Sequence, residues 1–189
     1  MKNRKTAVLG LFAALIVVLQ FLSYTVSIGV FNISLVLVPV VLAAVMYGKW
    51  AGGAMGFIFG VVVTVCSAIG LDKGGFILFS ANPFLTSLIC LLKGSAAGFV
   101  AGIVYKSLKD KKPYVAVLLA AVVTPVVNTG IFIIGMLTCF SDILYSWAGG
   151  TNIVTYIVVG LVGVNFLIEL VVNVILSSGI HTVIKSLQK

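Results

Sequence analysis

The sequence predicts an all-α membrane protein with six transmembrane helices and both termini in the cytoplasm. Three observations support this fold class. Of the 189 residues, 61% are hydrophobic and only 8% are charged, which is too little polar surface for a soluble domain of this length. The apolar residues form continuous runs rather than alternating patterns, which favours helices over barrel strands. The basic residues gather between alternate runs, as they do in multi-pass proteins.

Six apolar runs provide the predicted spans, and together they form a single integral membrane domain, 1–189. A helix needs about 20 residues to cross the hydrocarbon core. The second run is short and contains Pro39, so we expect it to be tilted or packed inside the bundle. The first run is not expected to be a cleaved signal peptide, because it lacks a small-x-small cleavage site followed by a soluble domain. The runs are residues 7–22, 33–47, 51–70, 83–105, 114–139 and 153–184.

With six spans, ten basic residues fall on one side of the membrane. The opposite side holds Lys73 together with Asp72 and Asp142. The positive-inside rule then places the more basic side, with both termini, in the cytoplasm. The net charge of +8 therefore reflects topology, and nucleic acid is not an expected partner. The ten residues are Lys2, Arg4, Lys5, Lys49, Lys106, Lys109, Lys111, Lys112, Lys185 and Lys189.

The sequence shows no motif for catalysis, metal binding or energy transduction, so we expect no enzyme activity, cofactor or metal. Cys66, Cys90 and Cys139 share no metal-ligand spacing and are predicted to be buried structural thiols. His181 stands alone, and one histidine makes neither a metal site nor a catalytic triad. The stretch "LKGSAAG" has the wrong order for a Walker A loop, so any ATPase must be another subunit.

Small residues recur at four-residue steps in three of the runs. In membranes such stripes let helices approach closely. For the third and fourth runs we expect internal packing. For Gly10 and Ala14 in the first run, internal packing and a docking face for a partner helix remain equal alternatives. The stripes in the third and fourth runs are Gly52, Gly56 and Gly60, and Gly94, Gly98 and Gly102.

Polar side chains lie near the middle of three apolar runs. Lys93 is in the fourth run, Asn128 and Thr129 are in the fifth, and Glu169 is in the sixth, where Asn165 and Asn173 share its helix face. Ionisable groups inside a membrane usually mark a functional site, so these residues predict a polar pocket for a small solute. The alternative is a Lys93–Glu169 ion pair that only holds two helices together.

Three connections on the side opposite the termini are expected to fold over this pocket as a lid. They span residues 24–32, 71–83 and 140–152, and they carry glycines, asparagines and aromatics with almost no net charge. The alternative is that their aromatics only anchor the chain at the membrane interface. From the second connection, Phe79 and Asn82 join the candidate binding residues.

The stretch "YGKWAGGAMGFIFG", residues 47–60, resembles the signature of the S components, the membrane substrate-binding subunits of energy-coupling factor (ECF) vitamin transporters. It departs from that signature because no proline precedes Lys49 and Trp50 follows it. The stretches "LLKGSAAGFVAGIVYKSLK" and "TPVVNTGIF" are similar to the pantothenate branch of the family. The positions that match this branch are Lys93, Asn128, Thr129, Asn165 and Glu169.

The resemblance implies a six-helix S-component bundle in the cell membrane of a bacterium. Such a subunit binds a vitamin from outside and docks on a transmembrane coupling subunit driven by two ATPase subunits. Docking in the family uses an Ala-x3-Ala motif on the first helix, and Gly10 and Ala14 occupy these positions here. We expect Lys93 to bind the carboxylate of pantothenate, while Asn128, Asn165 and Glu169 hydrogen-bond the rest. The alternatives are another vitamin, such as riboflavin, and an autonomous small-solute carrier.

Overall fold

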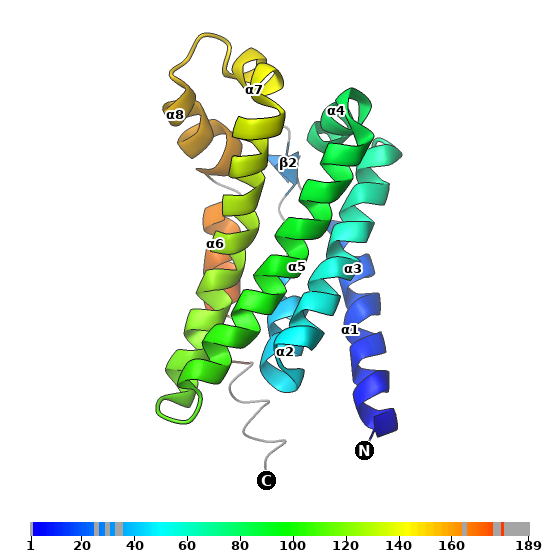
Figure 1. Cartoon of the computed structure of the whole chain (residues 1–189), viewed down its shortest axis with the longest axis vertical. Coiled ribbons are helices and arrows are strands. Elements are labelled where there is room, and N and C mark those ends of the chain that lie inside the picture. The colour runs from blue at the N-terminus through cyan, green and yellow to red at the C-terminus, as the bar shows by residue number, and fades with distance from the viewer. Residues whose placement is uncertain are drawn as a thin grey trace.

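The computed structural model describes residues 2–24, 27–28, 31–32, 36–163, 166–175 and 179. In this part of the chain the molecule is an elongated helical bundle (Figure 1). Four helices are long and apolar enough to cross a membrane. They are α1 (Lys2–Ser23), α3 (Lys49–Ala68), α5 (Pro83–Leu108) and α6 (Pro113–Cys139).

Glycines set the close approach of α3 and α5. A Cβ atom added to Gly56 would overlap the backbone carbonyl of Gly94, and one added to Gly98 would overlap the carbonyl of Gly52. Any side chain at these positions would force the two backbones apart. The glycine stripes of the third and fourth runs are therefore used for internal packing, as predicted.

The second predicted span is the eleven-residue helix α2 (Leu37–Tyr47), and most of its residues are buried. At about 1.5 Å per residue, α2 covers roughly half of the hydrocarbon core. The expectation that this run packs inside the bundle is confirmed. Gly48, with φ of 90°, turns the chain directly from α2 into α3.

The last predicted span is interrupted. It begins as α8 (Ile153–Thr155), continues as the π-helix η1 (Tyr156–Gly163) and resumes as a helix from Phe166 to Ile175. The two parts meet at an angle of 45°, and they make a fifth span if they are counted as one. Six spans and the orientation of the termini remain predictions.

The connections at the end opposite the N-terminus contain short helices, where the sequence suggested loops (Figure 1). Helix α4 (Lys73–Ala81) follows α3, and helix α7 (Ser141–Ala148) follows α6. The Asp72 carboxylate accepts a hydrogen bond from the Gly75 N–H and so caps α4. Two short antiparallel strands, β1 (Ser27–Ile28) and β2 (Phe31–Asn32), lie in the connection after α1.

The predicted grouping of charges is visible in the fold. The start of α1, the α2–α3 junction and the α5–α6 connection lie at one end of the bundle, while α4 and α7 lie at the other (Figure 1). The first end carries most of the ten basic residues, and Asp72, Lys73 and Asp142 lie at the second. His181, Lys185 and Lys189 lie outside the described residues.

Two of the three cysteines are buried, as predicted. Cys66 and Cys90 lie inside the bundle, but Cys139 is exposed at the end of α6. The prediction of a buried thiol was therefore wrong for Cys139, because it lies with Leu137 and Thr138 on the exposed side of the last turn of α6, whereas Met136 lies on the buried side.

Candidate ligand-binding site

A cavity of about 120 Å³ lies between the long helices. Its wall uses the first half of α5 and the second half of α6, so it lies in the half of the bundle opposite the N-terminus (Figure 1). The lining residues are Gln20, Tyr24, Phe59, Val63, Ser67, Asp72, Gly75, Leu78, Thr86, Ile89, Cys90, Lys93, Asn128, Thr129, Phe132, Met136, Phe140, Leu161, Phe166 and Glu169. This mixture of an apolar wall with a few polar groups is typical of small-molecule sites.

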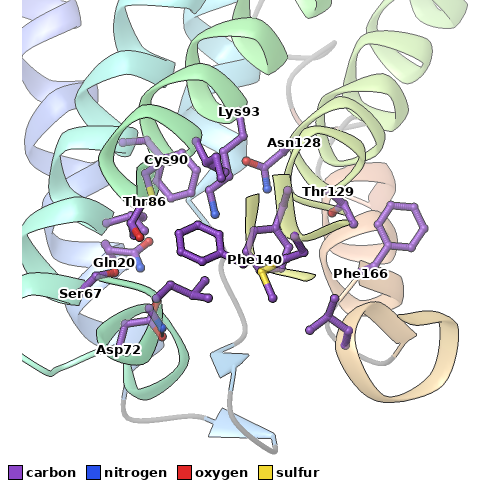
Figure 2. Close-up of a pocket in the computed structure, with 18 of the residues that line it drawn as sticks. Gln20, Ser67, Asp72, Thr86, Cys90, Lys93, Asn128, Thr129, Phe140 and Phe166 are labelled. Carbon is purple, nitrogen blue, oxygen red and sulfur yellow. Dashed lines mark hydrogen bonds between the residues drawn. The ribbon is translucent and has the colours of Figure 1, made fainter. Parts of the chain in front are cut away.

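The cavity brings together the polar residues that the sequence singled out on three helices. Lys93 of α5, Asn128 and Thr129 of α6, and Glu169 of the last helix all line it. Figure 2 shows the Lys93 amine pointing into the cavity, with Asn128 beside it. The predicted convergence of these side chains is confirmed, while their role in binding stays a prediction.

The Lys93 ammonium has an aromatic neighbour in the cavity wall. Its Nζ lies 5.1 Å from the centroid of the Phe132 ring, which is within range for a cation–π contact. This contact places the amine over an apolar part of the cavity wall. Asn128 is buried, and its Oδ1 has no hydrogen-bond partner among the described residues.

Glu169 lies on the buried face of the last helix. The Asn173 side-chain amide donates to the Glu169 backbone carbonyl at 2.8 Å, so the two residues share one face, as predicted. Asn173 is buried but is not among the cavity residues. Asn165, the third residue predicted for this face, lies outside the described residues.

Phe79 and Asn82 do not line the cavity. The Asn82 side chain accepts a hydrogen bond from the Leu85 N–H at 3.0 Å, which caps α5 just before Pro83. This hydrogen bond gives Asn82 a structural role at a helix start. Phe79 lies on α4 and is only partly buried.

Four polar residues of the cavity were missed by the sequence reasoning. Gln20 comes from the end of α1, Ser67 from the end of α3, Asp72 from the cap of α4, and Thr86 from the start of α5. In Figure 2 they are drawn on the side of the cavity away from Thr129 and Phe166. Gln20 and Asp72 were the available signals, since Gln20 is a polar residue inside the first apolar run and Asp72 is a carboxylate just after the third.

Asp72 is a partly buried carboxyl in the cavity wall. Burial raises the pKa of the Asp72 carboxyl, and the Gly75 N–H and the Lys93 charge partly oppose this shift. Asp72 and Lys93 therefore interact electrostatically across the same cavity. Because Asp72 also caps α4, the place of the Asp72 carboxylate in the cavity depends on the position of this short helix.

The two predicted docking residues lie on α1, away from the cavity. Gly10 and Ala14 are exposed, and a Cβ added to Gly10 would meet no atom within 4 Å. This differs from Gly52, Gly56 and Gly60 of α3, where an added Cβ would overlap the backbone of α5. The described part of the chain thus gives Gly10 no internal packing role.

Residues 4–180 match the family model "ECF transporter, substrate-specific component". The match covers most of the 189 residues, including all four long helices and the cavity. No curated protein and no solved structure matches the chain.

Proposed function

Because the chain belongs to the family of ECF transporter substrate-specific components, we propose that its cavity binds a vitamin that carries a carboxylate, with pantothenate favoured. Family membership makes the chain a substrate-specific subunit of a membrane transporter. In this function the whole chain forms one integral domain of six spans in a bacterial cell membrane. The vitamin enters from outside and leaves through a separate coupling module of one transmembrane subunit and two ATPases.

The observation that carries the proposal is the position of Lys93. Its amine points into a largely apolar cavity, beside the Asn128 amide and over the Phe132 ring. A charge-assisted hydrogen bond from an ammonium to a carboxylate is strong in such surroundings. We therefore place the solute carboxylate at Lys93.

The carboxylates of the cavity wall restrict how an anion is oriented. Asp72 and Glu169 would repel a solute carboxylate placed beside them, since like charges interact strongly away from water. Each of them accepts hydrogen bonds from a hydroxyl or an amide without this penalty. The Lys93 end is thus the favoured place for the carboxylate, and the hydroxyl and amide groups of pantothenate suit the remaining wall.

The direct test has two parts, of which the first is to identify, by mass spectrometry, the small molecule that co-purifies with the protein. The second is titration of Lys93→Ala with pantothenate, where we expect a loss of about 10-fold to 100-fold in affinity, because a hydrogen bond to a charged group contributes about 1.5–3 kcal/mol. Lys73→Ala is the matched control, since Lys73 is exposed on α4 and does not line the cavity.

The outcomes separate the alternatives. Unchanged affinity in Lys93→Ala removes the carboxylate role of Lys93. A loss of thermostability and expression together would favour the structural ion pair with Glu169. Riboflavin as the co-purified molecule would point to another branch of the family, and ATP-independent uptake by this chain alone would indicate an autonomous carrier.

A further inference from the structure

Three polar side chains from three different helices line one side of the cavity. They are Gln20 of α1, Ser67 of α3 and Thr86 of α5, and their exposed fractions are 4%, 0% and 3%. Figure 2 draws them on the same side of the cavity, together with Asp72. None of the three has a formal charge, and Asp72 adds a carboxylate, so this side offers hydrogen-bonding groups where the other side offers the Lys93 ammonium.

Each of these side chains has a buried polar atom that lacks a hydrogen-bond partner among the described residues. The atoms are Gln20 Oε1, Ser67 Oγ and Thr86 Oγ1. Buried polar groups are normally hydrogen-bonded, and an isolated exception is costly. Three such atoms around one cavity therefore indicate a polar ligand group that meets them.

Other hydroxyls of the same helices show that this is not a general property of the fold. The Ser87 hydroxyl, next to Thr86 in sequence, donates to the Pro83 carbonyl at 2.7 Å, and the Thr64 hydroxyl of α3 donates to the Gly60 carbonyl at 2.8 Å. Serine and threonine in helices commonly bond to their own backbone in this way. Ser67 and Thr86 depart from this pattern where they line the cavity.

Neighbouring groups hold two of these side chains in place. The Gln20 Nε2 donates to the Tyr24 hydroxyl at 2.7 Å, so its Oε1 remains as an acceptor. The absence of a side chain at Gly75 leaves room for the Ser67 hydroxyl, because a Cβ there would overlap it. An amide acceptor and two hydroxyls, which both donate and accept, complement a ligand hydroxyl.

We propose that Gln20, Ser67 and Thr86 form a second subsite that binds the hydroxyl-bearing end of the solute. The solute then spans the cavity, with its carboxylate at Lys93 and its hydroxyls at this hydroxyl subsite. For the carboxylate end this inference rests on the proposed function. A cavity with both subsites is selective for hydroxylated acids over unhydroxylated ones.

The test is isothermal titration of the full chain and of Ser67→Ala and Thr86→Val. The probes are pantothenate, a pantothenate analogue without both hydroxyls, and riboflavin. Each substitution should weaken pantothenate binding about 2-fold to 10-fold, since a neutral hydrogen bond contributes modestly. Neither should change the affinity for the analogue, whereas Lys93→Ala should weaken both acids. Ser87→Ala, whose hydroxyl bonds to its own helix, is the matched control and should bind like the unmodified chain.

A second measurement, the melting temperature of Thr86 variants, separates an effect on folding from an effect on binding. Without ligand, Thr86→Val should have a melting temperature no lower than that of the unmodified chain, because it removes an unpartnered buried hydroxyl. With pantothenate it should show a smaller thermal shift, and Thr86→Ser should recover that shift. A ligand-free protein that is destabilised by Thr86→Val, with no recovery in Thr86→Ser, would overturn the proposal.

The remaining outcomes distinguish the subsite from the proposed function. Equal losses for pantothenate and its analogue, or no loss for either, overturn the hydroxyl subsite while the carboxylate role of Lys93 stands. If the chain binds riboflavin and not pantothenate, the pantothenate assignment fails. The subsite is then supported if Ser67→Ala and Thr86→Val weaken riboflavin, which has a hydroxylated side chain, and overturned if they do not. If the chain binds neither pantothenate nor riboflavin, both the hydroxyl subsite and the pantothenate assignment are overturned.

Discussion

Asp72 shows how one partly buried side chain can line the cavity and cap a helix at the same time. Its carboxylate caps α4 through the Gly75 N–H and also lies in the field of Lys93. Burial outweighs these two stabilising interactions, so the pKa of Asp72 lies above its ordinary value. The charged form is therefore less favourable in the folded chain than in the unfolded chain.

The pH dependence of stability follows from this shift. A carboxyl with a raised pKa contributes stability that is fully present below its unfolded pKa of about 4 and is lost as pH rises through its folded pKa. In Asp72→Asn this contribution cannot titrate, while asparagine still caps the helix. We expect the melting temperature of the variant to fall less between about pH 4 and pH 7, as measured by thermal unfolding in detergent.

Asp142→Asn is the control, because Asp142 is exposed on α7 and should leave the pH dependence unchanged. A parallel fall in both Asp72→Asn and the unmodified chain would show that Asp72 does not carry this dependence. A uniformly lower melting temperature in Asp72→Asn would show that α4 needs the negative charge at its cap.

Individual residues differ in how far the sequence reveals their place. Lys93 and Glu169 were found because a charge inside an apolar run is costly unless it is used. Ser67 and Thr86 were missed because hydroxyls in membrane helices usually bond to their own backbone, as Ser87 does. Only the packing of three helices reveals that these two hydroxyls face the cavity.

At the scale of elements, α3 and α5 make the most extensive helix–helix contact in the described part of the chain. The four-residue glycine spacing predicted that both helices pack inside the molecule, since it places small residues along one helix face, but it did not predict that they pack against each other. The short helices α4 and α7 were not predicted, because the glycines at residues 74–75 and 149–150 suggested loops. Capping by Asp72 stabilises the start of α4 despite those glycines.

Gly56→Ala tests the close contact between α3 and α5. Its added methyl group would overlap the Gly94 carbonyl, so the helices must separate. Overpacking of this kind costs about 1–3 kcal/mol, and we expect a clearly lower melting temperature. Thermal unfolding of the purified protein measures it.

Gly53→Ala is the matched control on the same helix. A Cβ there would contact the Phe99 Cβ at 3.6 Å, which is ordinary van der Waals distance. The control should be as stable as the unmodified chain or slightly more stable, because alanine favours helices more than glycine does. Equal effects of the two substitutions would contradict the proposed role of the glycine contact.

At the scale of the whole molecule, the fold separates the cavity, where we propose that the solute binds, from an exposed helix face. The cavity uses α1 only near its end, at Gln20 and Tyr24, while Gly10 and Ala14 are exposed near its start. The small residues leave the helix face that Gly10 and Ala14 share without side-chain bulk, while Leu11 and Leu15 are exposed beside it. We expect the transmembrane coupling subunit to lie against it, as the family resemblance implies.

Gly10→Trp tests this docking face. It should abolish vitamin uptake in cells and leave solute binding by the isolated protein intact, because bulk there blocks close approach of a partner helix. Capture of the ATPase module in a pull-down should fall to background, and Ala14→Trp should behave alike. Leu22→Trp, at an exposed position near the other end of α1, should retain capture. Normal capture by Gly10→Trp, or loss of its solute binding, would contradict the docking assignment.

The glycine contact between α3 and α5 has a consequence for how solute preference can change over evolution. Gly52 and Gly56 of α3 make close backbone contacts with Gly98 and Gly94 of α5. Ser67 and Thr86, polar cavity residues of these helices, lie farther along them toward α4, and Lys93 is next to Gly94. Substitutions such as Ser67→Ala alter the lining without touching those contacts. The scaffold can therefore accept new linings at little risk to folding, so related chains with different solutes can share one backbone.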